Sequence, residues 1–149
     1  MDTIAAMRAN GLQRKTLELR TAAGTDVHDL TAEARSLVEE SGVREGQLLV
    51  FTPGSTAGVT TIEFESGAVS DFARLFEQLA PASGSYRHNE RWGDGNGYSH
   101  VRAALLGPSL TVPIAEGALL LGTWQQIVLV DFDNRPRNRK VVLDVTGWS

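Results

Sequence analysis

Alternating hydrophobic and polar positions predict β-strands along much of this chain. Between residues 12 and 21, Leu17 and Leu19 fall on one side of an extended backbone, while polar side chains occupy the other side. Similar patterns predict strands over residues 59–64, 124–132 and 139–146, and the short apolar run over residues 47–52 predicts a buried strand. Two further strands, 110–114 and 118–121, flank an Ala-Glu-Gly turn and are expected to form a hairpin.

Three segments change to the apolar spacing of a helix. Residues 29–41 carry an apolar stripe, with Thr31 as the expected N-cap. A second helix is expected over residues 70–81, with Ser70 as its cap. A third is expected over residues 96–107, where glycine ends it. This order of elements predicts an α+β fold, a mainly antiparallel sheet with about three helices.

Domain organisation follows from length and from the absence of linkers. The chain has 149 residues, enough to bury one core, and no low-complexity tract or long linker divides it. We therefore expect a single domain over residues 1–149. Residues 1–10 have a weak pattern, and we expect a loose tail or a short helix there.

Composition restricts the partners and the chemistry. The net charge is −4, which gives no overall field for attracting nucleic acid, so no nucleic-acid partner is expected. The chain has no cysteine, which excludes disulfides, thiol nucleophiles and cysteine zinc sites. No apolar segment approaches the roughly 20 residues that span a bilayer, and the first residues lack the pattern of a signal peptide. We expect a cytoplasmic protein without a membrane partner.

Residues 88–107 hold the densest candidate chemistry. His100 lies four residues after Asn96, so both are expected on one face near a helix N-terminus, with His88 and Asp94 on the glycine-rich loop before it. Free amides at a helix start favour an anion, and imidazoles bind zinc and similar ions. Both histidines are candidate metal ligands, proton shuttles or phosphate donors. The alternative is two satisfied interior histidines, with Asn96 as a helix cap.

Further candidates lie beside one predicted strand and on another. Ser55 and Thr56 follow a buried strand, where their hydroxyls and amides can hold phosphate oxygens or simply form a turn. Glu63 lies on the polar face of its strand as a candidate base or Mg²⁺ ligand, or as an ordinary surface glutamate.

The C-terminal third adds three arginines, a tryptophan and a glutamine. Arg135, Arg137 and Arg139 alternate, so they can project to one side of a strand and bind phosphate or carboxylate. Ion pairs between subunits explain them as well, and this interpretation is slightly favoured. Trp124 is expected in the core or in an interface, and Gln125 is a candidate pocket residue.

Together these segments resemble the YjbQ-like family, some of whose members are described as secondary thiamine-phosphate synthases. The resemblance covers roughly residues 30–147 and rests on the order and spacing of short motifs: Gly54-Ser55-Thr56-Ala57, Glu63, Asp71, Tyr86-x-His88, Asp94-x-Asn96-x-x-x-His100, Leu106-Gly107, Gly122-Thr123-Trp124-Gln125, and Asp133 with Arg137 and Arg139. The family's common pattern has a histidine at the position of Gly54. A three-histidine metal site is therefore not assumed for this chain.

The resemblance implies an α+β fold, a homotrimer and an enzyme that acts on a small phosphorylated or pyrophosphorylated molecule. In this leading hypothesis the phosphate contacts come from His100, Asn96, Ser55 and Thr56, with Gln125, Arg137 and Arg139 as further ligand-binding residues. Glu63 and Asp94 would hold Mg²⁺ or another divalent metal, Glu63 being the alternative base, and His88 would transfer a proton. The competing hypotheses are a non-catalytic trimer that binds an anion or a metal, and a purely structural protein.

Overall fold

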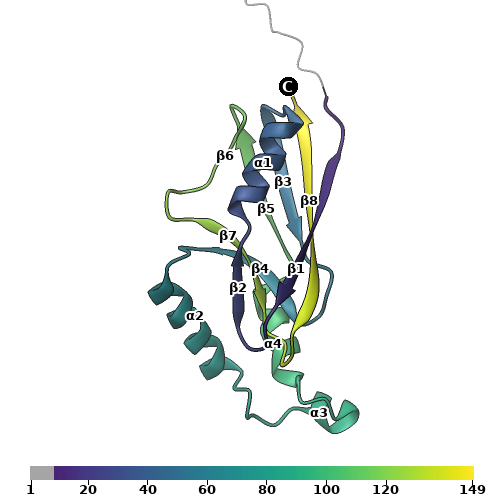
Figure 1. Cartoon of the computed structure of the whole chain (residues 1–149), viewed down its shortest axis with the longest axis vertical. Helices are drawn as coiled ribbons and strands as arrows, with labels where there is room; N and C mark the ends of the chain where they lie inside the picture. Colours follow the sequence, from purple (N-terminus) through teal and green to yellow (C-terminus); the bar gives the residue numbers. More distant parts are fainter. Residues whose placement is uncertain (1–8) are drawn as a thin grey trace, which may run out of the picture.

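The computed structural model describes residues 9–149, which form two antiparallel sheets and four helices (Figure 1). The elements, in chain order, are β1 Gln13–Thr21, β2 Asp26–Asp29, α1 Thr31–Ser41, β3 Glu45–Phe51, β4 Ala57–Ile62, α2 Ser66–Leu79, α3 Arg87–Trp92, α4 Gly97–Leu106, β5 Ser109–Ala115, β6 Ala118–Leu119, β7 Gln126–Asp131 and β8 Arg137–Trp148. The predicted α+β class is confirmed, with four helices in place of about three.

The larger sheet has the order β1-β8-β3-β5-β6, and the smaller has the order β2-β7-β4. Every pairing is antiparallel. In Figure 1, β1 and β8 run side by side along the long axis, α1 covers the upper part of the molecule, and α3 and α4 lie at the end away from the C-terminus. The predicted hairpin is present as β5 and β6.

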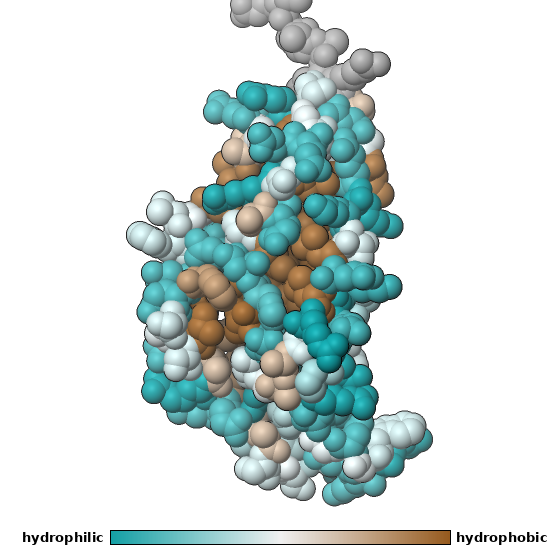
Figure 2. Space-filling view, in the orientation of Figure 1, coloured by the Kyte–Doolittle hydropathy of each residue, from teal (hydrophilic) through white to brown (hydrophobic). Residues whose placement is uncertain are grey.

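Strand β7 is buried on both faces, and this places the small sheet between two hydrophobic layers. Ile127 and Leu129 pack into the core shared with α1 and the larger sheet. Val128 and Val130 point the other way and pack with Phe132 against side chains of α2 and α4. Because successive side chains alternate, one strand serves both layers. Figure 2 shows apolar residues reaching the surface below α1 and between α2 and β2.

Two helix starts differ from the sequence prediction. Thr31 is the first residue of α1, and Leu30 occupies the N-cap position without a side-chain cap; the Thr31 amide donates to the Asp29 carboxylate at 3.0 Å. Helix α2 begins at Ser66, four residues before the predicted cap Ser70, since the side chain of Glu65 accepts two backbone amides of its first turn. Within residues 9–149 no helix is both long and apolar enough to cross a membrane.

The N-terminal segment is partly attached to the sheet. Residues 1–8 lie outside the described part of the chain, so the expected tail is not tested there. Ala9 forms an isolated bridge with Trp148, and the Asn10 amide donates to the Gly147 carbonyl at 3.0 Å. These two residues are therefore attached to the sheet.

Candidate functional site

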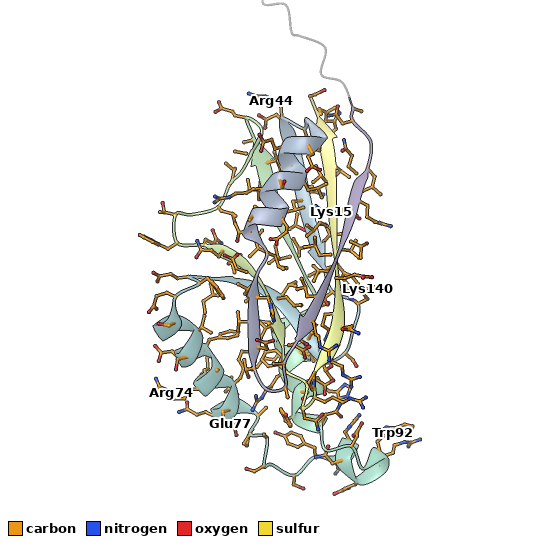
Figure 3. All side chains as sticks on the ribbon, in the orientation of Figure 1. Lys15, Arg44, Arg74, Glu77, Trp92 and Lys140 are labelled. Atoms are coloured by element: carbon orange, nitrogen blue, oxygen red, sulfur yellow. The ribbon has the colours of Figure 1, made fainter. Side chains whose placement is uncertain are left out.

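A pocket of about 420 Å³ lies where β7 turns into β8, beside the start of α4. Its walls come from the loop after β3, from α3, from the glycine-rich turn that follows and from the first residues of α4 and β8. The lining residues are Gly54, Ser55, Thr56, His88, Trp92, Asp94, Asn96, His100, Arg137 and Arg139. Trp92 is labelled at the protruding tip of α3 in Figure 3.

A buried ion pair forms the floor of this pocket. Arg139 of β8 donates from Nε and Nη2 to the two carboxylate oxygens of Asp131, at 2.6 and 2.8 Å. Asp131 is fully buried and Arg139 is only 9% exposed, so the pair is almost entirely shielded from water. The Thr21 hydroxyl donates to the same carboxylate at 2.6 Å. This two-point contact fixes the plane of the guanidinium group.

A second buried carboxylate, Asp133, connects three parts of the wall. It accepts hydrogen bonds from Arg137 Nε at 2.6 Å, from the Thr56 hydroxyl at 3.0 Å and from Asn96 Nδ2 at 3.3 Å. Burial alone would raise the pKa of Asp133, but hydrogen bonds from the Asn134 amide and these three side chains lower it below the ordinary value. The carboxylate is therefore ionised at neutral pH and holds the loop, the helix start and β8 together.

Both arginines keep donors that the protein does not use. Arg139 Nη1 makes no hydrogen bond to any described residue, and it lies 3.1 Å from the point that a Cβ at Gly54 would occupy. The missing side chain at Gly54 therefore leaves room in front of this nitrogen. Arg137 contributes only Nε to the contacts within residues 9–149, and its side chain is partly exposed. The pocket thus has a floor of positively charged N–H groups suited to an anion.

The two histidines pack against each other above this floor. His88 lies on α3 and His100 on α4, with ring centroids 4.3 Å apart and planes inclined by 40°. Burial, followed by the neighbouring His88, lowers the pKa of His100, against smaller opposing effects of Asp133 and Asp94. Neutral imidazole, able to donate or accept one proton, is therefore the favoured form of His100 at neutral pH.

Close contact between α3 and α4 positions this pair. The Gly97 amide at the start of α4 donates to the Asn89 side-chain oxygen at 2.8 Å. A Cβ on Gly97 would lie 2.6 Å from Tyr86 Cβ, so the approach requires glycine at this position. His88 was expected on a loop, and the structure corrects this by placing it on the short helix α3.

Asn96 occupies the N-cap position of α4, but its side chain caps nothing. Its Nδ2 donates to Asp133 instead, and its Oδ1 is buried without a hydrogen-bond partner among the described residues. His88 Nδ1 is in the same situation, 3.5 Å from Asp94 Oδ1 without a hydrogen bond. The helix-cap interpretation of Asn96 is therefore wrong for its side chain.

The structure brings most of the candidate residues together and separates two. Glu63 follows the last residue of β4, and Gln125 precedes β7, where its side chain donates to Thr61. Thr56 lies at the other end of β4, about 20 Å away at about 3.3 Å per residue. Within one chain, Glu63 therefore cannot share a cation with Asp94 or act in this pocket, and Gln125 does not line it.

The arginine and tryptophan interpretations also change. Arg137 and Arg139 pair with Asp133 and Asp131 of the same chain, and pairing between subunits stays a prediction. Arg135 is exposed in the turn before β8. Trp124 is 72% exposed, which excludes it from the core.

Two pocket features escaped the sequence prediction. The alternating pattern of residues 124–132 places Asp131 in a strand and assigns it no role. Two acidic residues two positions apart, followed by two alternating arginines, nevertheless indicate facing ion pairs across a turn. Trp92 was not expected to line a site.

As for a metal, no group of three or more His, Asp or Glu side chains among residues 9–149 is arranged to hold an ion, and two imidazoles alone make an incomplete shell.

His100 should make the protein less stable in mild acid. Its folded-state pKa lies below the ordinary value of 6.5, so the unfolded chain takes up a proton that the folded chain resists. The full stability is present above this value and is lost as the pH falls through 6.5 toward the folded-state pKa. We expect the melting temperature to drop between about pH 7.5 and about pH 5.5, and to drop less in His100→Asn.

The control is His28→Asn, which removes a histidine of β2 outside the pocket. In this variant the melting temperature should still drop on acidification as it does in the unmodified protein. If the melting temperature of His100→Asn dropped on acidification as much as that of the unmodified protein, His100 would not resist protonation in the folded state.

Comparisons with known proteins agree with this architecture. The family model described as UPF0047 protein YjbQ-like matches residues 15–148. A UPF0047 protein of Methanothermobacter thermautotrophicus is 41% identical over 131 residues, which cover 88% of this chain and 90% of the relative. The UPF0047 protein YugU of Bacillus subtilis is 33% identical, with 89% and 98% covered.

Solved structures lead to the same family. A YbjQ-like protein of unknown function from Sulfolobus solfataricus superposes with a TM-score of 0.82 at 29% identity, covering 91% of this chain and 99% of that protein. An uncharacterised conserved protein of the yjbq/upf0047 family from Clostridium acetobutylicum gives a TM-score of 0.80 at 35% identity, with 88% and 98% covered. This chain therefore belongs to the UPF0047 family of YjbQ-like proteins.

Proposed function

We propose that this protein is an enzyme acting on a small phosphorylated or pyrophosphorylated molecule. One observation carries the proposal: unused N–H groups of Arg137 and Arg139 face a pocket that also holds the packed pair His88 and His100. Guanidinium groups supply fixed positive charge for a phosphoryl group, and neutral imidazole can move a proton. Positive charge for the phosphoryl group and a group that can transfer a proton therefore lie in the same pocket.

In its concrete form, the activity is a weak thiamine-phosphate synthase reaction. The ring nitrogen of a thiazole phosphate forms a bond to the methylene carbon of a hydroxymethylpyrimidine diphosphate. The carbon–oxygen bond to pyrophosphate breaks, and its electron pair leaves with the pyrophosphate. Charge growing on this leaving group needs electrostatic stabilisation rather than covalent help, which matches the donors present.

The pocket residues divide into direct and supporting roles. Arg139 Nη1, Arg137 and the Ser55 hydroxyl would bind the diphosphate, and His88 and His100 would hold or transfer its proton. Thr56 is a positioning residue, because its hydroxyl already accepts from Arg139 Nη2 at 2.6 Å and donates to Asp133. A divalent cation such as Mg²⁺ would neutralise further charge, and Asp94 is the exposed carboxylate at the pocket edge.

A non-catalytic binding protein is the second candidate. Glu63, the carboxylate expected as a base, lies at the far end of β4. The two described carboxylates buried at the pocket are Asp131 and Asp133, and both are paired with arginines. The pocket therefore holds no free buried carboxylate among the described residues to act as a base. Such a protein would use the same pocket to bind an anion or a metal without turnover.

We infer further that the protein assembles with copies of itself, as a homotrimer if it follows the family resemblance. Several large apolar side chains are exposed on one chain, among them Leu120 and Trp124 in the segment between β6 and β7. Exposed tryptophan and leucine of this kind are typical of protein interfaces.

Sedimentation analysis should give a mass three times that of the chain. Trp124→Lys should lower the mass, because a charge in the apolar contact is costly. Gln78→Lys is the control, since Gln78 is an exposed polar residue of α2, and this variant should keep the full mass. A monomeric mass for the unmodified protein would contradict the trimer.

The enzyme proposal predicts formation of thiamine phosphate from the two phosphorylated precursors with Mg²⁺. His100→Ala should reduce the rate by about 100-fold or more, as expected when a group that transfers a proton is lost. His28→Ala makes the same change outside the pocket and should keep the rate.

The alternative outcomes separate the candidates. Equal rates in the unmodified protein and His100→Ala would place the chemistry elsewhere. No product from any variant, together with phosphate binding that depends on Arg139, would favour the non-catalytic binding protein.

A further inference from the structure

Asn96 presents a hydrogen-bond acceptor for which the protein has no donor. The residue is 5% exposed and lines the pocket. Its orientation is set by its neighbour, because an ionised Asp133 only accepts hydrogen bonds and must therefore face Nδ2. Oδ1 is consequently the atom left without a partner among residues 9–149. A buried acceptor without a donor is unfavourable, so this atom indicates a missing ligand group.

A second unpartnered atom belongs to another residue that lines this pocket. His88 Nδ1 is buried without a hydrogen bond, and the Asp94 carboxylate lies 3.5 Å beyond it. The floor of the same pocket presents the unused guanidinium N–H groups of Arg137 and Arg139. The pocket therefore presents unused donors together with the unused acceptor of Asn96.

The doubly ionised phosphoryl group of a phosphate ester satisfies only the arginine donors. Its oxygens accept from the arginines, but it has no N–H or O–H to offer to Asn96 Oδ1. An ester that carries a hydroxyl or amino group close to its phosphoryl group would satisfy the donors and the acceptor at once.

We propose that the ligand of this pocket is a phosphate ester bearing a hydroxyl or amino group, and that Asn96 Oδ1 accepts the hydrogen bond of that group. Asn96 is then a specificity-determining residue. This inference rests on the proposed binding of phosphate by Arg137 and Arg139. Sites built around a ligand hydrogen bond discriminate strongly against analogues that lack it, because the buried protein group is left unpaired.

The test compares two phosphate esters of nearly equal shape by titration calorimetry in EDTA. 2-Hydroxyethyl phosphate carries the donor, and propyl phosphate replaces the hydroxyl by a methyl group. The full-length protein should bind the hydroxyl ester about tenfold more tightly than the propyl ester, with inorganic phosphate as the reference anion. In Asn96→Leu, which keeps the approximate shape without the acceptor, the ratio should fall to about one.

The matched control is Asn138→Leu, an exposed position of β8 outside this pocket, which should keep the tenfold ratio. The comparison within the unmodified protein decides the question even if Asn96→Leu fails to fold. Equal binding of both esters, with phosphate binding intact, would overturn the role of Asn96 alone.

Two other outcomes have distinct meanings. A preference that appears only with Mg²⁺ would overturn direct acceptance by Oδ1 and assign that atom to a cation. Absence of binding by both esters and by inorganic phosphate would overturn the phosphate site itself, and this inference with it.

Discussion

The buried ion pair between Asp131 and Arg139 is the constraint on which the pocket depends. Removing two charges from water costs several kcal/mol per ion, and only close, multiple contacts offset that cost. Here two contacts of 2.6 and 2.8 Å and a third from Thr21 do so. Because the guanidinium group is rigid and planar, fixing Nε and Nη2 also fixes Nη1, which then faces the pocket beside Gly54. A buried structural contact thus orients a group for binding.

The position of this pair follows from β7, the strand buried on both faces. Its alternation places Asp131 at the end of the strand on the side of β8, while Phe132 continues the layer under α2 and α4. Asp133 then lies within reach of Arg137 and Asn96. The hydrophobic layer therefore docks α4, and the polar residues on either side of Phe132 attach the helix start to β8. Packing and pocket geometry therefore both depend on Asp131, Phe132 and Asp133.

The sequence predicted every strand except β2, three helices and most pocket residues, because alternation and helical spacing are local properties. The spacing of Asn96 and His100 placed both at one helix start, as the structure confirms. Helix α3 has six residues and depends on contacts such as Asn89 with Gly97, which no local pattern reveals. Glu63 was misplaced because alternation gives the face of a strand but not its distance from a site. The partner of Arg139 was missed because pairing across the β7–β8 turn is a tertiary contact.

A crystal structure of the protein soaked with inorganic phosphate, in solutions free of sulfate and of other phosphate sources, tests the central claim most directly. The account predicts phosphate in the pocket between Arg139 Nη1, Arg137 and the Ser55 hydroxyl, with the contact between Asp131 and Arg139 unchanged. Phosphate bound elsewhere, or an empty pocket at saturating phosphate, would contradict the claim that this ion pair orients an anion-binding group.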